Sequence, residues 1–170
     1  MEVLSHDERV AVARLRALIE LLPTALDRHL SPTGVTSFEF TLLEALHSAE
    51  LGRLRLTALA SRTNATLPRL SRVVTGLESK GLVVRAACEE DGRATNAVLT
   101  KAGDAAYRQT RPIYEGAVRD IVLRNLDDDS VGQLATISYA VLTALDPERR
   151  LAVTEDGAEP ACAADPLHEA

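Results

Sequence analysis

Basic side chains are concentrated in one short stretch of a chain that is acidic overall. The 170 residues carry a formal net charge of −6, yet the 33 residues from Arg53 to Arg85 contain seven bases and a single acid, Glu78. A basic stretch in an acidic chain is typical of a surface that binds a polyanion. The alternative is a solvated face of surface arginines, which normally carries acids between its bases. The composition therefore favours a polyanion partner.

The centre of this stretch predicts a helix with two different faces. Thr66 can cap the helix, Pro68 falls in its first turn, and Gly81 follows its end. One face is an apolar stripe with i, i+3, i+4 and i+7 spacing, made of Leu70, Val73, Val74 and Leu77. The opposite face is predicted to hold Pro68, Arg69, Arg72, Thr75 and Gly76. Because arginine can pair with O6 and N7 of guanine, and hydroxyls can contact bases or phosphates, this face has the chemistry to read DNA.

The neighbouring segments predict the elements that position this helix. A short helix over residues 58–63, capped by Thr57, precedes it after a brief turn, which is the spacing of a helix-turn-helix. The sequence RLRL (53–56) predicts a short strand. The runs LVVRAA (82–87) and ATNAVLT (94–100), joined by CEEDGR, predict a β-hairpin. A helix-turn-helix followed by a hairpin is a winged helix.

Long helices are predicted on both sides of this unit. Capping boxes at residues 5–8 and 36–39 mark two helix starts, and the first helix is expected from about residue 6 to about residue 30, where Pro23 can introduce a kink. Residues 101–126 predict a helix interrupted at Pro112, and residues 127–145 predict a last one. The terminal helices have more apolar positions than a small helix-turn-helix unit can bury, which predicts burial by another chain.

The stretch from Leu56 to Gly103, LTALASRTNATLPRLSRVVTGLESKGLVVRAACEEDGRATNAVLTKAG, resembles the multiple-antibiotic-resistance regulator (MarR) family of bacterial transcription factors. The matching signals are the order helix, turn, LE-x-K-G-L-V-x-R, D-x-R and LT-x-x-G, and the resemblance covers about residues 6 to 145. It implies a mainly α fold with a small β-wing, a winged helix-turn-helix with N- and C-terminal dimerisation helices. It further implies a sequence-specific regulator of transcription, a repressor, that binds a pseudo-palindromic operator in double-stranded DNA as a homodimer.

The resemblance also divides the chain. Residues 6–35 and 104–145 are expected to form a helical dimerisation region, and residues 36–103 the winged helix-turn-helix lobe that binds DNA. Residues 146–170 contain seven acids, two bases and three prolines, so they are predicted to be a disordered acidic tail.

Site residues follow from the resemblance position by position. The residues expected to contact bases and phosphates are Thr66, Pro68, Arg69, Ser71 and Arg72. Arg85 falls on a position that commonly meets the DNA backbone. On the wing, Arg93 is expected in the minor groove with Asp91 bracing it, because a narrow groove concentrates negative potential. Gly92 replaces the arginine most common there, which predicts weaker wing contacts than is usual in the family.

Other functions have less support. The family often binds small phenolic or anionic effectors between the dimer helices and the DNA-binding lobe, and His29, His47 and Arg14 are candidates to line such a cleft, although the sequence selects no effector. A winged-helix module for protein interaction or dimerisation, without DNA binding, is the main alternative, and an enzyme with a pocket between dimer helices is another. No catalytic motif and no metal-ligand spacing occur, so no enzyme activity, metal or cofactor is expected.

Two further expectations concern cellular context. Cys88 is a candidate redox sensor, but a reactive cysteine needs a lowered thiol pKa, and the adjacent acids Glu89 and Glu90 would raise it. The absence of a signal sequence and of an 18-residue apolar run predicts a cytoplasmic protein with no membrane partner.

Overall fold

Six α-helices and a small antiparallel sheet make up the computed structural model, which describes residues 3–87 and 95–154. The helices are α1 (His6–Leu30), α2 (Ser37–His47), α3 (Leu56–Arg62), α4 (Leu67–Ser79), α5 (Lys101–Val118) and α6 (Asp128–Leu145). The strands are β1 (Arg53–Arg55), β2 (Val83–Ala87) and β3 (Thr95–Leu99). Short helical turns are η1 (Ser31–Thr33), η2 (Glu50–Gly52), η3 (Arg119–Leu123) and η4 (Ala152–Thr154). The predicted mainly helical fold with a small β-wing is confirmed.

Local capping sets most of the helix starts. Both predicted capping boxes form, one between Ser5 and Glu8 and one between Thr36 and Glu39. The prediction that Thr57 caps α3 is wrong, because strand β1 leads directly into the helix and Arg55 occupies its N-cap position. Thr66 does hold the N-cap position of α4, but its side chain makes no capping hydrogen bond.

The sheet forms the wing and joins it to the lobe. Its strand order is β1-β3-β2, and β2 pairs with β3 from Val83 opposite Leu99 to Ala87 opposite Thr95. Strand β1 lies on the other side of β3, with Leu54 opposite Ala97. The predicted hairpin is therefore confirmed. Its connecting residues, 88–94, lie outside the described part of the chain.

The core lies between α2, α3, α4 and the start of the sheet. Fully buried residues from these elements include Phe40, Leu43, Leu46, Leu59, Leu70, Val74, Leu77 and Val83. Helix α5 closes the core, since Tyr114 stacks on Phe40 with ring centroids 4.3 Å apart. The apolar stripe predicted on α4 thus faces the core and leaves the opposite face of that helix to solvent.

A close contact fixes the start of α5 against the wing. The hydroxyl of Thr100 accepts a hydrogen bond from the N–H of Gly103 (3.0 Å) and donates to the carbonyl of Gly81 (2.8 Å). A Cβ atom on Gly103 would lie 2.1 Å from the carbonyl oxygen of Leu82. The LT-x-x-G sequence therefore has a packing reason, because only glycine lets the first turn of α5 approach this backbone so closely.

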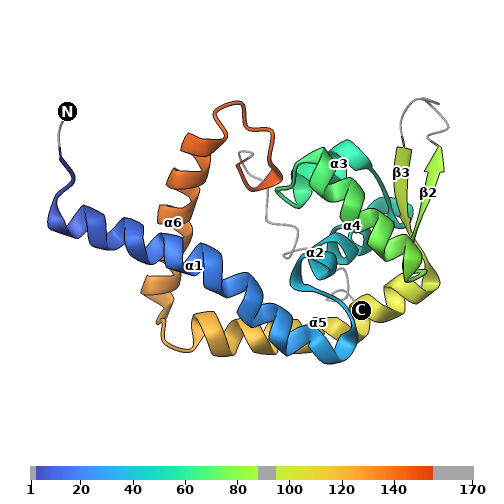
Figure 1. Cartoon of the computed structure of the whole chain (residues 1–170), viewed down its shortest axis with the longest axis horizontal. Helices are drawn as coiled ribbons and strands as arrows, with labels where there is room; N and C mark the ends of the chain where they lie inside the picture. Colours follow the sequence, from blue (N-terminus) through green and yellow to red (C-terminus); the bar gives the residue numbers. More distant parts are fainter. Residues whose placement is uncertain (1–2, 88–94, 155–170) are drawn as a thin grey trace.

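Helices α1 and α6 extend away from the lobe, toward the left of Figure 1. Helix α6 has no buried residue. Large apolar side chains on the two helices are exposed: Val12, Leu15, Leu18, Ile19, Leu21, Val131, Leu134, Ile137, Val141 and Leu145. Within residues 3–87 and 95–154, no helix is long and apolar enough to cross a membrane.

The first nine residues of the predicted disordered tail have a defined conformation. The buried Asp146 carboxylate accepts hydrogen bonds from the N–H of Leu151 (2.8 Å) and the hydroxyl of Thr154 (2.6 Å). The hydroxyl of Ser61 in α3 donates to the carbonyl of Arg150 (2.5 Å), so η4 packs on the lobe. Composition missed this turn because it depends on one carboxylate and a contact distant in sequence. Residues 155–170 lie outside the described residues.

Candidate nucleic-acid interface

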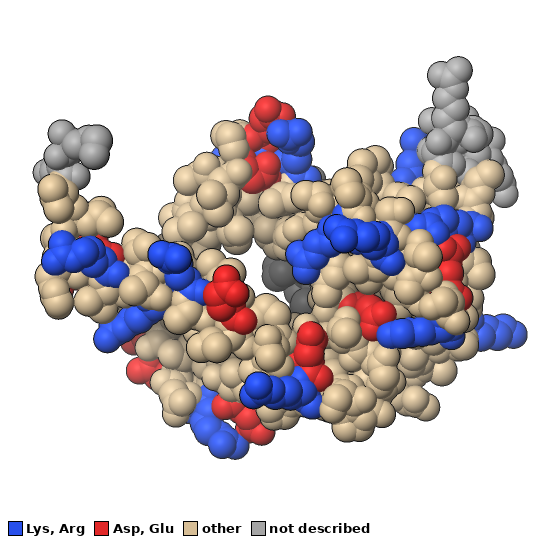
Figure 2. Space-filling view, in the orientation of Figure 1, with Lys and Arg blue, Asp and Glu red and all other residues tan. Residues whose placement is uncertain are grey.

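The exposed face of α4 brings together most of the predicted DNA-contacting residues. Thr66, Pro68, Arg69, Ser71 and Arg72 are all exposed on one helix whose other face is buried. Basic side chains gather over the α3 and α4 part of the molecule in Figure 2. The helix is therefore held firmly by its core face while its basic face remains open to a partner.

The two arginines of this face are in different situations. The Arg69 guanidinium lies over the ring of Phe38 in α2, with its carbon 4.1 Å from the ring centroid. A cation–π contact at an exposed site contributes about 0.5–1 kcal/mol, so it orients Arg69 without burying its donors. Arg72 makes no hydrogen bond or ion pair with any other described residue. Its donors are thus available to a ligand.

Arg85 joins the wing to α4 and is not free. Its guanidinium forms an ion pair with Glu78 and donates to the carbonyl (2.9 Å) and hydroxyl (3.2 Å) of Ser71 and to the hydroxyl of Thr75 (3.2 Å). These contacts use most of the donors that a DNA phosphate would need. They also occupy the Ser71 hydroxyl, so Ser71 and Arg85 fix β2 against α4.

Gly76 does not lie on the exposed face, and that prediction is wrong. It is half-buried toward α2, where an added Cβ would lie 3.8 Å from Oε1 of Glu39. The turn of α4 that carries Gly76 faces the buried carboxylate of Glu39 in α2. The spacing of residues within α4 does not reveal this contact with another helix. The predicted wing residues, Arg93 and Asp91, lie outside the described residues.

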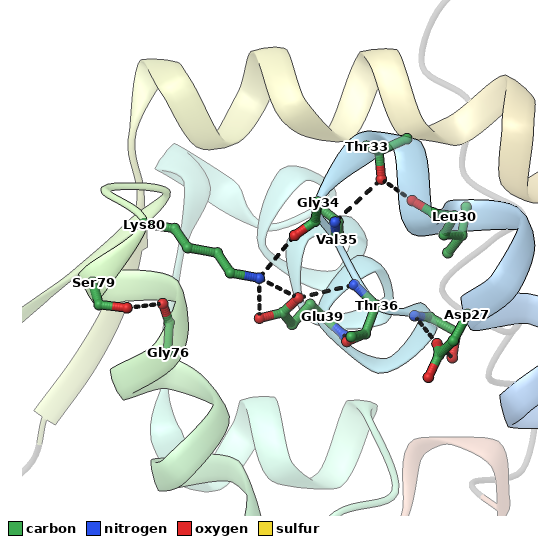
Figure 3. Close-up of polar contacts among 11 residues, drawn as sticks. Asp27, Leu30, Thr33, Gly34, Val35, Thr36, Glu39, Gly76, Ser79 and Lys80 are labelled. Carbon is green, nitrogen blue, oxygen red and sulfur yellow. Dashed lines mark hydrogen bonds and ion pairs between the residues drawn. The ribbon is translucent and has the colours of Figure 1, made fainter.

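A polar cluster at the C-terminal end of α4 was not predicted (Figure 3). Nζ of Lys80 lies 2.7 Å from each carboxylate oxygen of Glu39 and donates to the carbonyl of Gly34 (2.9 Å). In α1, Asp27 accepts from the N–H (2.7 Å) and hydroxyl (2.6 Å) of Ser37. The sequence predicted Glu39 only as part of a capping box, because its ion-pair partner, Lys80, is 41 residues away in the chain.

The residues predicted to line an effector cleft have separate partners. Nδ1 of His47 lies 2.7 Å from Oδ1 of Asp104 in α5, and His29 contacts the carbonyl of Ala25 in its own helix (2.9 Å). No hydrogen bond or ion pair within the described ranges joins either histidine to Arg14. The hydrogen bond from Arg108, followed by that from His47, holds the pKa of Asp104 below its ordinary value. Of the residues described, no three His, Cys, Asp or Glu side chains form a group that could hold a metal ion.

Helices α3 and α4, with the antiparallel strands β2 and β3 after them, define a winged helix-turn-helix protein. The sequence model of the MarR family matches residues 33–94. Among solved structures, the chain is similar to Sco3205, a MarR family transcriptional regulator from Streptomyces coelicolor, in a crystal structure with DNA. The two are 32% identical, with a TM-score of 0.83 over 86% of this chain and 92% of Sco3205. The chain belongs to the MarR family.

Two further relatives agree with this assignment. The crystal structure of AbsC, a MarR family transcriptional regulator from Streptomyces coelicolor, is 28% identical, with a TM-score of 0.81 over 86% of this chain and 99% of AbsC. The HTH-type transcriptional repressor YetL of Bacillus subtilis (strain 168) is 29% identical over 104 residues, 61% of this chain. That match spans only 62% of the YetL sequence.

Proposed function

We propose that this protein is a sequence-specific regulator of transcription that inserts α4 into the major groove of double-stranded DNA. The observation that carries the proposal is the division of α4 into a buried face, with Leu70, Val74 and Leu77, and an exposed face with Arg69 and Arg72. Sco3205, whose crystal structure contains DNA, supports the proposal because its fold matches over most of both chains.

The exposed residues take different roles in this proposal. Arg72, with its donors unused, reads bases, and Arg69 contacts DNA from its position over Phe38. Thr66 and Pro68 lie at the N-terminal end of the helix, which is the end that faces base edges in helix-turn-helix complexes. Arg93, supported by Asp91, would reach the minor groove. Arg85 acts indirectly, by holding the wing on α4.

The proposal includes a homodimer built from residues 6–35 and 104–145, with residues 36–103 as the DNA-binding lobe. Its support is the exposed apolar surface of α1 and α6, since contiguous apolar surface on a small protein marks an interaction site. A two-fold dimer would place two copies of α4 about 34 Å apart, which suits a pseudo-palindromic operator.

We further propose that the regulator is a repressor that responds to a small phenolic or anionic effector. The name of YetL, a transcriptional repressor, supports the first part. The second part is supported by the family resemblance, which implies effectors between the dimer helices and the DNA-binding lobe; His47, which contacts Asp104 and the ring of Tyr107 in α5, is the candidate residue there. The proposal contains no catalytic step.

Arg72→Ala tests the proposed recognition face. The substitution should weaken binding to a selected operator by about 1–3 kcal/mol, because it removes a side chain that reads a base pair. Lys101→Ala, in the exposed first turn of α5, is the control, since it removes one positive charge away from α4. Equal affinities of the folded Arg72→Ala variant and the wild type would overturn the assignment.

Ile137→Asp tests the proposed dimer. Ile137 is 62% exposed on the apolar face of α6, so a charge there should convert the dimer to monomer in sedimentation experiments without unfolding the lobe. Thr143→Asp places the same charge roughly 120° around the axis of α6 from Ile137, away from the apolar side chains, and should leave the dimer intact. A dimer that survives Ile137→Asp unchanged would refute this role of α6.

If the protein dimerises but retains no DNA at low salt, it is instead a protein-interaction module.

A further inference from the structure

The C-terminal end of α4 is tied to the junction between α1 and α2 by a single lysine. Lys80 follows the last residue of α4, and its ammonium group contacts both oxygens of Glu39 at 2.7 Å and the carbonyl of Gly34 at 2.9 Å (Figure 3). Gly34 ends the turn that connects α1 to α2, and Glu39 lies in the first turn of α2. One side chain therefore connects three elements.

Glu39 is well placed to hold Lys80 rigidly. Its side chain is only 10% exposed, and its Oε2 also accepts a hydrogen bond from the N–H of Thr36 at 2.9 Å. The capping box thus fixes the position of the Glu39 carboxylate independently of Lys80. A buried carboxylate needs a charged partner, so the pair strongly favours the one placement of α4 that keeps Lys80 in reach.

The connection continues from α2 into α1. Asp27 of α1 accepts two hydrogen bonds from Ser37, the residue next to Thr36. Asp27, the first turn of α2 and Lys80 therefore form a continuous series of polar contacts from α1 to the end of the recognition helix. In Figure 3 the residues of this series lie around the start of α2, with α4 on one side and α1 on the other.

The contacts of Lys80 hold the C-terminal end of α4, and the orientation of α4 decides where Arg72 lies along the operator. Lys80 lies about 12 Å along the helix axis from Arg72, so rotation of α4 about its C-terminal end would move Arg72 across the groove. At its other side, α4 is held by Arg85 of β2, a strand of the wing. Lys80 makes an ion pair with α2 and a hydrogen bond with the turn that follows α1, and α1 belongs to the proposed dimerisation region.

We infer that Lys80 and Glu39 are positioning residues that set the orientation of α4 relative to α1, and thereby the half-site spacing that the dimer accepts. This inference rests on the proposed function as a dimeric DNA-binding regulator. It assigns the two residues no contact with DNA. Their loss should consequently change which operator spacings are bound, while the sequence preferred within each half-site stays the same.

The test is a selection of random duplexes with the wild type and with Lys80→Met, followed by affinity measurements on operators lengthened or shortened by one base pair. Wild-type protein should strongly prefer one spacing. For Lys80→Met the ratio between the affinities for the preferred and the altered spacing should fall about fivefold or more, the lower end of typical coupling between sites. Binding to a duplex with one half-site should change little.

Two control variants distinguish loss of the Lys80–Glu39 contact from loss of a surface charge and from a change in packing near Glu39. Lys101→Met removes the same charge from the exposed first turn of α5 and should keep the wild-type spacing ratio. Gly76→Ala adds a methyl group 3.8 Å from Oε1 of Glu39, an ordinary contact distance, and should also keep it. If Lys80→Met does not fold, Glu39→Gln gives the same reading, because glutamine keeps an acceptor for Thr36 and removes the charge.

The outcomes distinguish this inference from the proposed function. If the wild type selects a pseudo-palindrome and the Lys80→Met and Glu39→Gln variants keep its spacing ratio, the inference is wrong and the proposed function stands. Equal loss of affinity for all spacings and for the single half-site would also overturn it, since that is the result of a general structural defect. If the wild type selects no motif, the proposed function itself fails.

Discussion

Replacing Gly103 by alanine should destabilise the protein, although alanine is the better helix former. The added Cβ would lie 2.1 Å from the carbonyl oxygen and 3.0 Å from the carbonyl carbon of Leu82, and 2.7 Å from Cδ1 of Leu99. The first two atoms belong to backbone, so they cannot move by a change of rotamer. Overpacking of this kind costs about 1–3 kcal/mol.

The net effect follows from two opposing contributions. Alanine in a helix interior gains about 0.5–1 kcal/mol over glycine. Because the contact is far inside van der Waals distance, we expect the upper part of the overpacking range and a net loss of about 2 kcal/mol. For a protein of this size that corresponds to a fall in Tm of about 4–8 °C.

Thermal denaturation followed by circular dichroism measures this change, with all variants at one protein concentration because a dimer's Tm depends on concentration. Gly116→Ala is the matched control in the same helix, since an added Cβ there meets no atom within 4 Å. Its Tm should equal or exceed that of the wild type. A Gly103→Ala protein as stable as Gly116→Ala would refute the packing explanation of the LT-x-x-G sequence.

Two other substitutions have predictable effects on stability. Asp104→Asn should lower the Tm at neutral pH, because the lowered pKa of Asp104 means that its ionised form stabilises the folded state. This contribution to stability is present above the unfolded pKa of Asp104, close to 3.8, and is lost as the pH falls through the lower folded pKa. The difference in Tm between the variant and the wild type should therefore disappear in acid. A Tm difference that does not depend on pH would contradict this origin. Thr110→Val should leave the Tm unchanged or raise it, because the buried Thr110 hydroxyl has no partner among the described residues and valine keeps its shape. A clear loss of stability in calorimetry would show that the hydroxyl has a partner.

The features that the sequence predicted correctly depend on residues close together in the chain. The capping boxes at Ser5 and Thr36 and the apolar stripe of α4 are set within one or two helix turns. The hairpin was predictable because β2 and β3 are separated by a short polar segment. These signals were enough to predict the fold class.

The features that were missed depend on pairs far apart in sequence. Lys80 and Glu39 are 41 residues apart, and His47 and Asp104 are 57 apart, so neither pair has a local signature. The contacts of Arg85 depend on the angle between β2 and α4, which no spacing specifies. Sequence patterns therefore located the recognition face but did not separate the arginine that is free, Arg72, from the one that is bound, Arg85.

The most direct test of the central claim is a selection of random DNA duplexes by the purified protein, read by sequencing at two salt concentrations. A dimer that inserts two copies of α4 into successive major grooves should recover a pseudo-palindrome with half-sites about 10 bp apart. Its affinity should fall steeply as salt rises, because phosphate contacts release counterions. Recovery of no motif, with negligible retention even at low salt, would contradict the account.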